Sequence, residues 1–529
     1  MRPRYALWFF AVALCEVALL SVPRHSMASS ALYESGSDPA LGFNLVSWWN
    51  FGSSGASTWQ NAVQSAYDAG FREISISPLR FVNINTGAIS ATSPRGPDLS
   101  HVEAGVERAK SLGMRVTLNP FVELFDAHNA GTGDDEYFAD LPGGCTWRGC
   151  WNPTAGSAVS NQFWTDYQSY LTGVAQIASN YNVDAMTIGT EMKALDGNSA
   201  HNASWGSAIT AVDNVYSGPL GYSANWDDYH NANLQAAIWE NPKIDFIGID
   251  SYFNSVLYDY YKYTNPALTT TQINTLVTNA VNPIQGYPDA AFIDLMTSAW
   301  NKYLDIDTPQ VSSGGRTYFE HDGILPYAAA RKGGAGMPVQ FTEQGYLYFN
   351  TSSASPQTSS GSIDTSEQIM AYQALLLAMD GRQNSVRAID VWQWEMPGSN
   401  GSQWNINTSA SADQPNNRRL AILLSRFVRN LIPGDFNLDG RVDANDYVVW
   451  RNTQGQIVTL FDGADGNGDG TINAADYTIW RSYFGATVAA GTGAASPLPE
   501  PAAAWFLVST ALISIMRPTV RRSPPQTIE

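Results

Sequence analysis

Residues 161–191 read NQFWTDYQSYLTGVAQIASNYNVDAMTIGTE, a helical segment followed by a strand that ends at a glutamate. The strand, VDAMTIGTE (183–191), is largely apolar, as expected for a parallel strand covered on both faces. Seven further short runs that favour strands occur between residues 42 and 395. They are GFNLVSWW (42–49), FREISISP (71–78), MRVTLNPF (114–121), PLGYSANW (219–226), IDFIGIDSY (244–252), MPVQFTEQGY (337–346) and AIDVWQWE (388–395).

Longer segments separate these runs, and several have helical character: 59–69, 99–112, 161–180 and 367–379. Alternation of strands with helices indicates an α/β fold with parallel strands. Eight such units within 41–430 predict a (β/α)₈ TIM barrel with insertions. A doubly wound sheet is the alternative, but no Gly-rich phosphate loop follows the first strand. The longest insertion, 253–336, follows the sixth strand, and its role is left open.

Polar and aromatic residues gather at the carboxyl ends of the strands, where barrels of this type place their active sites. Glu191 ends the fourth strand and Glu343 the seventh. Two opposed carboxylates about 5–5.5 Å apart suit a retaining glycosidase. A lone glutamate at a strand end is usually structural, whereas two among tryptophans favour catalysis. The candidate substrate-binding residues are Trp48, Asn119, Asn225, Trp226, Asp250, Tyr252, Tyr346 and Trp394.

Five of these stretches resemble the clan A glycoside hydrolases, and most closely family 113, the β-1,4-mannanase-type barrel. They are GTE (189–191), YSANW (222–226), DFIGIDSY (245–252), PVQFTEQGY (338–346) and VWQW (391–394). The resemblance implies that Glu191 is the acid/base and Glu343 the nucleophile. Most of the clan has Asn before the acid/base. Thr190 stands there instead, as in the GTE form of family 113, which suits mannose with its axial 2-hydroxyl.

The positions of the other candidates predict supporting roles. Trp394 is expected to form a platform beneath the sugar, with a barrel-core tryptophan as the alternative. Tyr252 and Tyr346 are expected to hydrogen-bond the nucleophile and keep it ionised. Asn119, Asn225 and Asp250 are expected to bind sugar hydroxyls, although a structural role at the rim is open for Asp250.

The sequence therefore favours a secreted retaining hydrolase of β-1,4-linked polysaccharide, with β-mannan or glucomannan as the expected substrate. The alternatives are a β-glucanase or xylanase of the same clan, and a non-catalytic carbohydrate-binding or scaffold protein on a decayed barrel. No catalytic cofactor is expected, because His128, His201 and His230 lack metal-ligand spacing.

Near the C-terminus, DFNLDGRVDAND (435–446) and DGNGDGTINAAD (465–476) repeat with a 30-residue offset. Each places oxygen side chains at positions 1, 3, 5, 9 and 12 and glycine at 6, the pattern of a calcium loop. The expected ligands are Asp435, Asn437, Asp439, the Arg441 carbonyl, Asp443 and Asp446 in the first loop. The second offers Asp465, Asn467, Asp469, the Thr471 carbonyl, Asn473 and Asp476.

This repeat, within 434–485, resembles a type I dockerin, a small all-α module of paired half EF-hands found on secreted carbohydrate-active enzymes. The resemblance implies structural calcium and a possible cohesin-like protein partner. Cellulosomal dockerins often carry a Ser/Thr pair at loop positions 10 and 11. Here these positions are Ala444–Asn445 and Ala474–Ala475, so the sequence does not fix a partner.

Both termini indicate export. Residues 1–31 have the anatomy of a signal peptide, with basic residues, an apolar stretch and small residues. A linker (486–498) leads to PEP (499–501), an apolar run and arginines up to 522. This resembles a PEP-CTERM sorting signal, which implies processing by an exosortase in a Gram-negative-type bacterium and a cell-surface, outer-membrane or extracellular location. A plain tail anchor is the alternative.

Cys15 lies inside the predicted signal peptide, which leaves Cys145 and Cys150 in CTWRGC. An oxidising destination predicts a disulfide between them, with two free thiols as the alternative. The net charge of −19 argues against a nucleic-acid partner. Charged residues are only 15% while aromatic residues reach 12%, a balance that suits a surface stacking on sugar rings.

Overall fold

The structure is a computed structural model of the 529-residue chain. It describes residues 39–46, 55–68, 71–89, 98–126, 136–137, 141, 144–253, 256–281, 289–305, 311–313, 316–318, 323–347, 351–354, 356, 365–379, 381–394, 433–437, 441–458, 463–467 and 470–486. The predicted signal peptide, most of the linker and the PEP-CTERM-like segment lie outside these residues, as do Trp48, Asp439 and Asp469.

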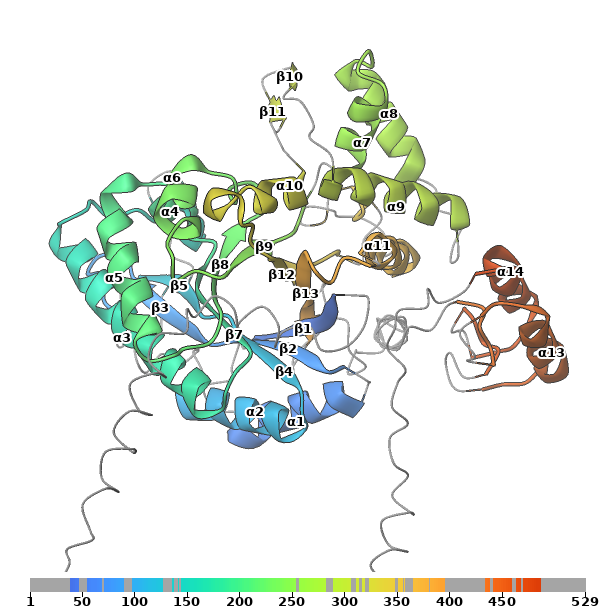
Figure 1. Ribbon diagram of the computed structural model, residues 1–529, viewed down its shortest axis with the longest axis horizontal. Helices are drawn as coiled ribbons and strands as arrows, with labels where there is room; N and C mark the ends of the chain where they lie inside the picture. Colours follow the sequence, from blue (N-terminus) through green and yellow to red (C-terminus); the bar gives the residue numbers. More distant parts are fainter. Residues whose placement is uncertain are drawn as a thin grey trace, which may run out of the picture. The chain divides into compact units, whose positions relative to one another are not determined.

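Eight parallel strands form a closed barrel, in the order β1-β13-β12-β9-β8-β7-β4-β2 (Figure 1). The prediction of a TIM barrel is confirmed, and closure of the sheet rules out the doubly wound alternative. The barrel strands are β1 (Ala40–Val46), β2 (Glu73–Ser77), β4 (Arg115–Leu118), β7 (Ala185–Thr190), β8 (Leu220–Asn225), β9 (Phe246–Asp250), β12 (Val339–Gln344) and β13 (Val386–Trp394). The peptide bond between Trp392 and Gln393 is cis.

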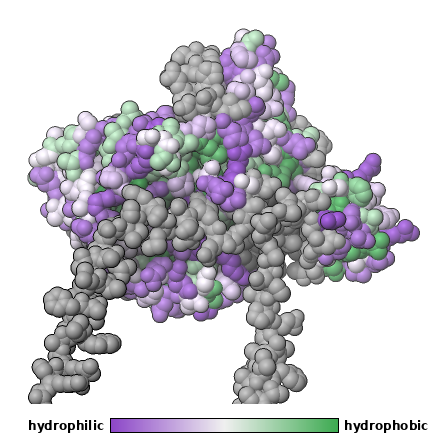
Figure 2. Space-filling view, in the orientation of Figure 1, coloured by the Kyte–Doolittle hydropathy of each residue, from purple (hydrophilic) through white to green (hydrophobic). Residues whose placement is uncertain are grey.

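Helices surround the barrel and bury apolar side chains, in most of them along one stripe. In α1 (Ala56–Asp68) the buried residues Trp59, Ala62, Val63 and Ala66 follow the helical period. The other outer helices are α2 (Leu99–Ser111), α3 (Ala158–Asn180), α5 (Asn202–Asp213), α9 (Ala290–Asp305) and α11 (Thr365–Ala378). Hydrophilic residues cover much of the described surface on the face shown in Figure 2.

Two barrel strands continue beyond the barrel wall into a small second sheet. After Pro78, β2 leads to β3 (Leu79–Asn83), and β4 leads to β5 (Phe121–Asp126). β5 also pairs with β6 (Glu136–Tyr137). The short helix η2 (Arg148–Cys150) follows in sequence, in contact with β5. The carboxyl ends of the second and third barrel strands are thereby extended.

The long insertion is mainly helical in its described residues. It contains α7 (Val256–Thr264), α8 (Thr270–Val281), α9, the hairpin β10–β11 (Val311–Ser313 and Arg316–Tyr318) and α10 (Ile324–Ala329). α9 packs against α11, while α7 packs on both α8 and α9 (Figure 1). α9 and α11 therefore complete the wall of the barrel on this side.

The C-terminal module contains α13 (Ala444–Thr453) and α14 (Ala474–Tyr483). Each helix begins with a capping box, made by Asp443 with Asp446 and by Asn473 with Asp476. The small core is formed around Phe436, Trp450 and Ile472. The predicted all-α module is confirmed.

None of the helices in the described part of the chain is both long enough and apolar enough to cross a membrane.

Candidate active site

A bulge precedes Glu191 at the end of β7. Thr187 pairs with Gly221 and Thr190 with Ser223, so one extra residue is accommodated on β7. Gly189 has a φ of +152°, and a Cβ there would lie 2.4 Å from the Tyr167 hydroxyl oxygen. The position therefore requires glycine. Glu191 itself has a φ of +49°, a conformation that is costly for a side chain and is concentrated at functional sites.

A second bulge lies at Glu343. On β12, Phe341 pairs with Ile249 and Glu343 with Asp250, so β12 has one residue more than β9 over this interval. Bulges redirect side chains and are common beside active sites. Both glutamates proposed from the sequence are thus placed by local breaks in strand regularity.

Glu343 is held by one oxygen and keeps the other available. Its Oε2 accepts a hydrogen bond of 2.7 Å from the Tyr252 hydroxyl, while its Oε1 has no partner among the described residues. The side chain is buried but retains 3% exposure. Burial, followed by the negative charges of Asp250 and Glu191, raises the pKa of Glu343, and Arg148 and the Tyr252 hydrogen bond oppose this rise.

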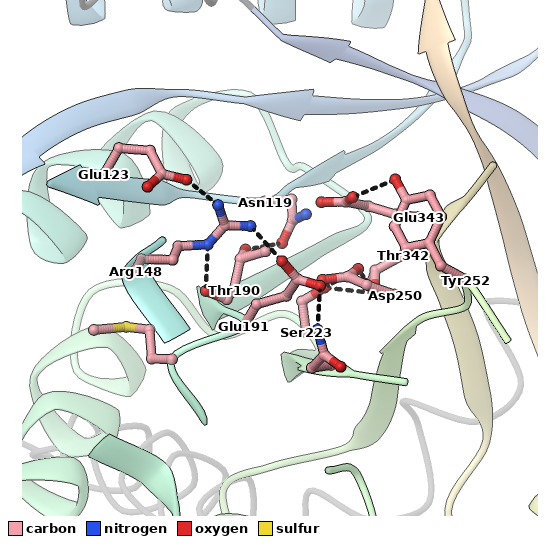
Figure 3. A network of polar contacts seen from close by, with 12 residues as sticks. Asn119, Glu123, Arg148, Thr190, Glu191, Ser223, Asp250, Tyr252, Thr342 and Glu343 are labelled. Atoms are coloured by element: carbon pink, nitrogen blue, oxygen red, sulfur yellow. Dashed lines mark hydrogen bonds and ion pairs between the residues drawn. The ribbon is translucent and has the colours of Figure 1, made fainter. Parts of the chain in front are cut away.

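Glu191 is held at both oxygens. Asn225 Nδ2 donates to Oε1 over 2.8 Å. Arg148 Nη2 lies 2.8 Å from Oε2, and Figure 3 shows this contact. Burial raises the pKa of Glu191, whereas the positive charge of Arg148 lowers it. The two glutamates influence each other's charge, so protonation of one favours ionisation of the other.

Asp250 lies inside the barrel rather than at an open surface. Its Oδ1 accepts hydrogen bonds from Ser223 (2.6 Å) and Thr342 (2.9 Å), and the side chain is fully buried. These contacts join β8, β9 and β12. Asp250 therefore has a structural role through Oδ1. Its Oδ2 is buried with no partner among the described residues, and the sugar-binding role stays a prediction.

Asn119 faces the same region from the end of β4. Its Oδ1 accepts from the hydroxyls of Thr187 (2.6 Å) and Thr190 (3.0 Å). Its Nδ2 is buried and has no partner among the described residues. A buried amide donor without a partner is costly, so Asn119 is suited to donate to a ligand.

The structure separates two tryptophans that a regular strand would place on one face. Between Val391 and Trp394, β13 has an extra residue relative to β1, and the inward–outward alternation changes there. Trp394 packs against Phe43 and Phe71, with ring centroids 4.9 and 5.7 Å away, and donates to Ser65 of α1. It is a core residue, and the expectation of a sugar platform was wrong.

Trp392, unlike Trp394, lies outside the main barrel core. It lies in a cluster with Tyr252, Phe121 and Val46 at the carboxyl ends of the strands, and Trp226 packs against this cluster. Trp392 keeps 7% exposure. Sequence reasoning missed it, although the VWQW run contains it.

Tyr346 is also placed differently from the expectation. Its hydroxyl accepts from Trp300 Nε1 over 3.1 Å, and its ring meets Tyr372 edge-on at 5.1 Å. It therefore fills the space between α9 and α11. Tyr252 is the tyrosine that bonds Glu343.

We expect the two tryptophans to respond differently to truncation. Trp394→Ala should lower the free energy of unfolding by about 3–5 kcal/mol, because it empties a core site, while the folded fraction keeps its kcat/KM. Trp392→Ala should lower kcat/KM roughly tenfold or more through lost sugar contact. Thermal melts and kinetics on the folded fraction check both, and equal kinetic losses would contradict the distinction.

Arg148 and Glu123 join the site without having been predicted. Arg148 forms an ion pair with Glu123 of β5 as well as with Glu191, and its Nε donates to the Thr190 carbonyl over 3.1 Å. The predicted Cys145–Cys150 disulfide is confirmed, and it encloses Arg148. The sequence signal was an arginine between two cysteines, but nothing in the sequence linked it to Glu191.

The C-terminal loops are arranged as ligand loops around their last aspartates. Asp446 accepts from the backbone N–H groups of Phe436 and Asn437 through Oδ1 and from Asp443 through Oδ2. In the second loop, Asp476 accepts likewise from Asn467 and Asn473. Asp435, Asp446, Asp465, Asn467 and Asp476 are all buried.

This donor set fits calcium, which prefers carboxylate and carbonyl oxygens. Each carboxylate oxygen has a second lone pair beyond its backbone bond. Within the described part of the chain, no three acidic, His or Cys side chains form a complete metal cluster, and Asp439 and Asp469 lie outside that part.

The barrel combines a carboxylate that has one uncommitted oxygen with a second carboxyl held by an arginine and an amide. Two carboxyls at the carboxyl end of a TIM barrel are what hydrolysis of a glycosidic bond requires. Residues 74–284 match the sequence model of Glycoside Hydrolase Family 113, a segment that includes Glu191 and ends before Glu343, and residues 433–485 match that of the Dockerin type I domain. The chain is therefore a glycoside hydrolase with a family 113 domain and a C-terminal type I dockerin domain.

Solved structures similar to this chain include three described as mannanases. A GH113 β-1,4-mannanase is 14% identical, with 74% of this chain and 98% of that chain covered and a TM-score of 0.45. The GH113 β-mannanase AaManA from Alicyclobacillus acidocaldarius, in complex with ManMIm, is 15% identical (75% and 99% covered, TM-score 0.46). An endo-β-1,4-mannanase from Thermotoga petrophila is 9% identical (76% and 79%, TM-score 0.42). None of the curated proteins matches this chain.

Dockerin domains bind calcium and are found on secreted carbohydrate-active enzymes. The combination of domains is that of an enzyme acting outside the cell or at its surface.

Proposed function

We propose that the chain is a retaining glycoside hydrolase that cleaves β-1,4-linked mannan or glucomannan, with Glu343 as nucleophile and Glu191 as acid/base. The observation that carries this proposal is the difference between the two carboxyls. Glu343 Oε1 has no partner among the described residues, while Tyr252 holds its Oε2, and Glu191 is fixed by Asn225 and Arg148.

In the first step, Glu343 Oε1 attacks the anomeric carbon and the bond from that carbon to the leaving oxygen breaks. Glu191 gives its proton to the leaving oxygen. In the second step, water attacks the anomeric carbon, Glu191 takes a proton from that water, and the ester to Glu343 breaks. The step needs Glu343 ionised while Glu191 is protonated. The mutual repulsion of their charges favours a pair that holds a single proton.

The residues around the two glutamates support a sugar ligand. Trp392 and the partly exposed Trp226 offer apolar ring faces, while Asn119 Nδ2 supplies a buried donor that lacks a partner among the described residues. Thr190 directs its hydroxyl to Asn119 Oδ1 and to the Pro120 carbonyl. The amide that binds the sugar near Glu191 is thus proposed to come from Asn119. Mannan is favoured by the family 113 match of this segment.

Activity on a panel of mannan, glucomannan, xylan and β-glucan tests the substrate. We expect reducing ends to be released fastest from mannan or glucomannan. Faster release from xylan or β-glucan would contradict the mannanase proposal and identify the enzyme as a xylanase or β-glucanase of the same clan. No release from any of them, together with measurable binding, would favour the non-catalytic alternative.

Glu191→Ala should slow hydrolysis most for substrates with a poor leaving group. The acid is needed when the departing oxygen is basic, and general acid catalysis contributes roughly 10²–10⁴-fold. Polysaccharide should therefore lose most of its turnover, while an aryl glycoside with an acidic phenol should retain much of its glycosylation rate. Azide should then accelerate the second step and give a β-glycosyl azide. An equal loss on both substrates would contradict the acid/base role.

For the termini and the dockerin domain, we propose export through residues 1–31, removal of the segment after about residue 499 by an exosortase-type enzyme, and a cohesin-like partner. Among the described residues, the exposed large hydrophobics are Val448, Ile457 and Phe484, all in the dockerin domain, which supports a protein contact there. Intact-mass measurement of the native protein tests the processing, since a chain that still ends at Glu529 would favour the tail anchor.

A further inference from the structure

The loop 145–150 reaches the active site through one side chain. The disulfide between Cys145 and Cys150, with Cα atoms 6.4 Å apart, closes a six-residue loop. Cys150 is exposed at its outer end, whereas the Arg148 side chain is only 6% exposed and points inward. A surface cross-link and a buried cation therefore belong to the same short loop.

Arg148 connects the ends of two strands (Figure 3). Its Nη1 pairs with Glu123 of β5, its Nη2 lies 2.8 Å from Glu191 Oε2, and its Nε donates to the Thr190 carbonyl. Its guanidinium also lies 4.7 Å from the ring centroid of Phe121. With this many fixed contacts, the guanidinium constrains where Glu191 can lie.

The charges around Glu191 are unbalanced. Arg148 faces it from η2, together with a hydrogen bond from the Trp147 side chain, and Asn225 donates to it from β8. The acidic groups around it are Glu123 of β5, Asp227 after β8, Asp250 of β9 and Glu343 of β12. Arg148 is the cation that Glu191 shares with Glu123, Asp250 and Glu343, whereas Asp227 is paired with Lys193 of α4 (Lys193–Asp196) over 2.7 Å. Glu123 takes part of the charge of Arg148.

We propose that Arg148 is a positioning residue for the acid/base carboxyl of Glu191, that Glu123 is its counter-ion, and that the Cys145–Cys150 disulfide holds Arg148 in place. This inference rests on the proposed function. In the structure Glu191 accepts bonds at both oxygens, the arrangement of an ionised carboxylate. The pairing with Glu123 offsets the charge of Arg148, which allows Glu191 to hold a proton for the first step.

The proposal predicts opposite pH effects for two substitutions. Arg148→Gln removes the positive charge that lowers the pKa of Glu191, so the pKa rises and the basic limb of kcat/KM moves to higher pH. Glu123→Gln leaves Arg148 uncompensated and removes a negative neighbour, so the pKa of Glu191 falls. The basic limb then moves to lower pH, because the free enzyme loses its acid earlier.

The variants should also differ in kcat/KM at the pH optimum of the parent enzyme. Arg148→Gln should lower kcat/KM roughly 10- to 100-fold, the usual worth of a hydrogen bond to a charged group. Arg148→Lys keeps the positive charge, so the basic limb of its kcat/KM profile should lie at the same pH as in the parent enzyme. As a matched control, Arg382→Gln removes the ion pair with Asp305, away from Glu191, and should leave the profile unchanged. If the basic limbs of Arg148→Gln and Glu123→Gln shift in the same direction, or do not shift, the inference is overturned.

The role of the disulfide is tested by asking whether the effect of its removal depends on the presence of Arg148. The double substitution Cys145→Ser/Cys150→Ser should lower kcat/KM several-fold in the parent and much less in the Arg148→Gln background, because the positioned group is already lost. Equal effects in both backgrounds would show that the disulfide acts only on general stability. Thermal melts of all variants separate that effect from misfolding.

A readout without turnover separates this inference from the proposed function. Difference infrared spectra between the parent and Glu191→Gln isolate the carboxyl band of Glu191, which can be titrated in each variant. Opposite displacements of that titration by Arg148→Gln and Glu123→Gln would support the positioning role even if the substrate panel fails. If the Glu191 carboxyl band titrates at the same pH in the parent and in both variants, the positioning role is overturned even if the parent enzyme is active.

Discussion

Glu343→Ala should reduce turnover by about 10⁴-fold or more, the scale seen when a covalent nucleophile is removed. Azide should restore part of the activity on an aryl β-glycoside with a good leaving group. The reason is steric and electrostatic: a small anion can occupy the volume beside Tyr252 that the carboxylate leaves. Because azide attacks from the nucleophile's side, the product should be the α-glycosyl azide, the opposite anomer to that from Glu191→Ala.

A matched control separates catalysis from stability. Glu73 is equally buried in the barrel, where it pairs with Arg115 at 3.0 Å. Glu73→Ala should destabilise the protein without rescue by azide. Rescue of both variants, or full activity of Glu343→Ala, would contradict the nucleophile assignment.

Removal of calcium should unfold the dockerin domain and leave the barrel intact. The two halves of the domain depend on each other: Trp450 of α13 donates to the Asn473 carbonyl at 2.7 Å, and Trp480 of α14 donates to the Asp443 carbonyl at 2.8 Å. Each helix is thus tied to the opposite loop. Without a cation, repulsion among the acidic side chains should open the loops and release both helices, because binding supplies folding free energy in small metal domains.

Limited proteolysis of the full chain checks this expectation. In chelator, cleavage should concentrate within 433–485, and calcium should protect this segment, while hydrolase activity stays the same. Asp435→Ala/Asp465→Ala should be cleaved with or without calcium. Protection that is identical in chelator and in calcium would contradict the calcium requirement.

The barrel could be predicted because its signal is spread over many residues. Eight apolar runs in alternation with helices identify the strands, and the rule that active sites lie at carboxyl ends then selects Glu191 and Glu343. The two tryptophans of VWQW could not be assigned, because regular alternation puts Trp392 and Trp394 on one face and the bulge in β13 separates them. A bulge depends on pairing with neighbouring strands, which a single sequence does not show.

Contacts between distant segments were also beyond sequence reasoning. Arg148 follows a weakly patterned loop, and its link to Glu123 and Glu191 arises only when β5 and β7 lie near each other. Tyr346 was misassigned for a similar reason, since Trp300 of the insertion binds its hydroxyl. The predicted residues that the structure brings together, such as Glu191, Glu343 and Asn225, lie at the carboxyl ends of barrel strands.

The stereochemistry of hydrolysis tests the central claim most directly. The anomeric proton of the first product released from a β-1,4-mannan oligosaccharide can be followed by NMR before mutarotation. A double displacement through Glu343 predicts that the β-anomer appears first and the α-anomer later. Initial appearance of the α-anomer would show single displacement with inversion and contradict the assignment of Glu343 as nucleophile.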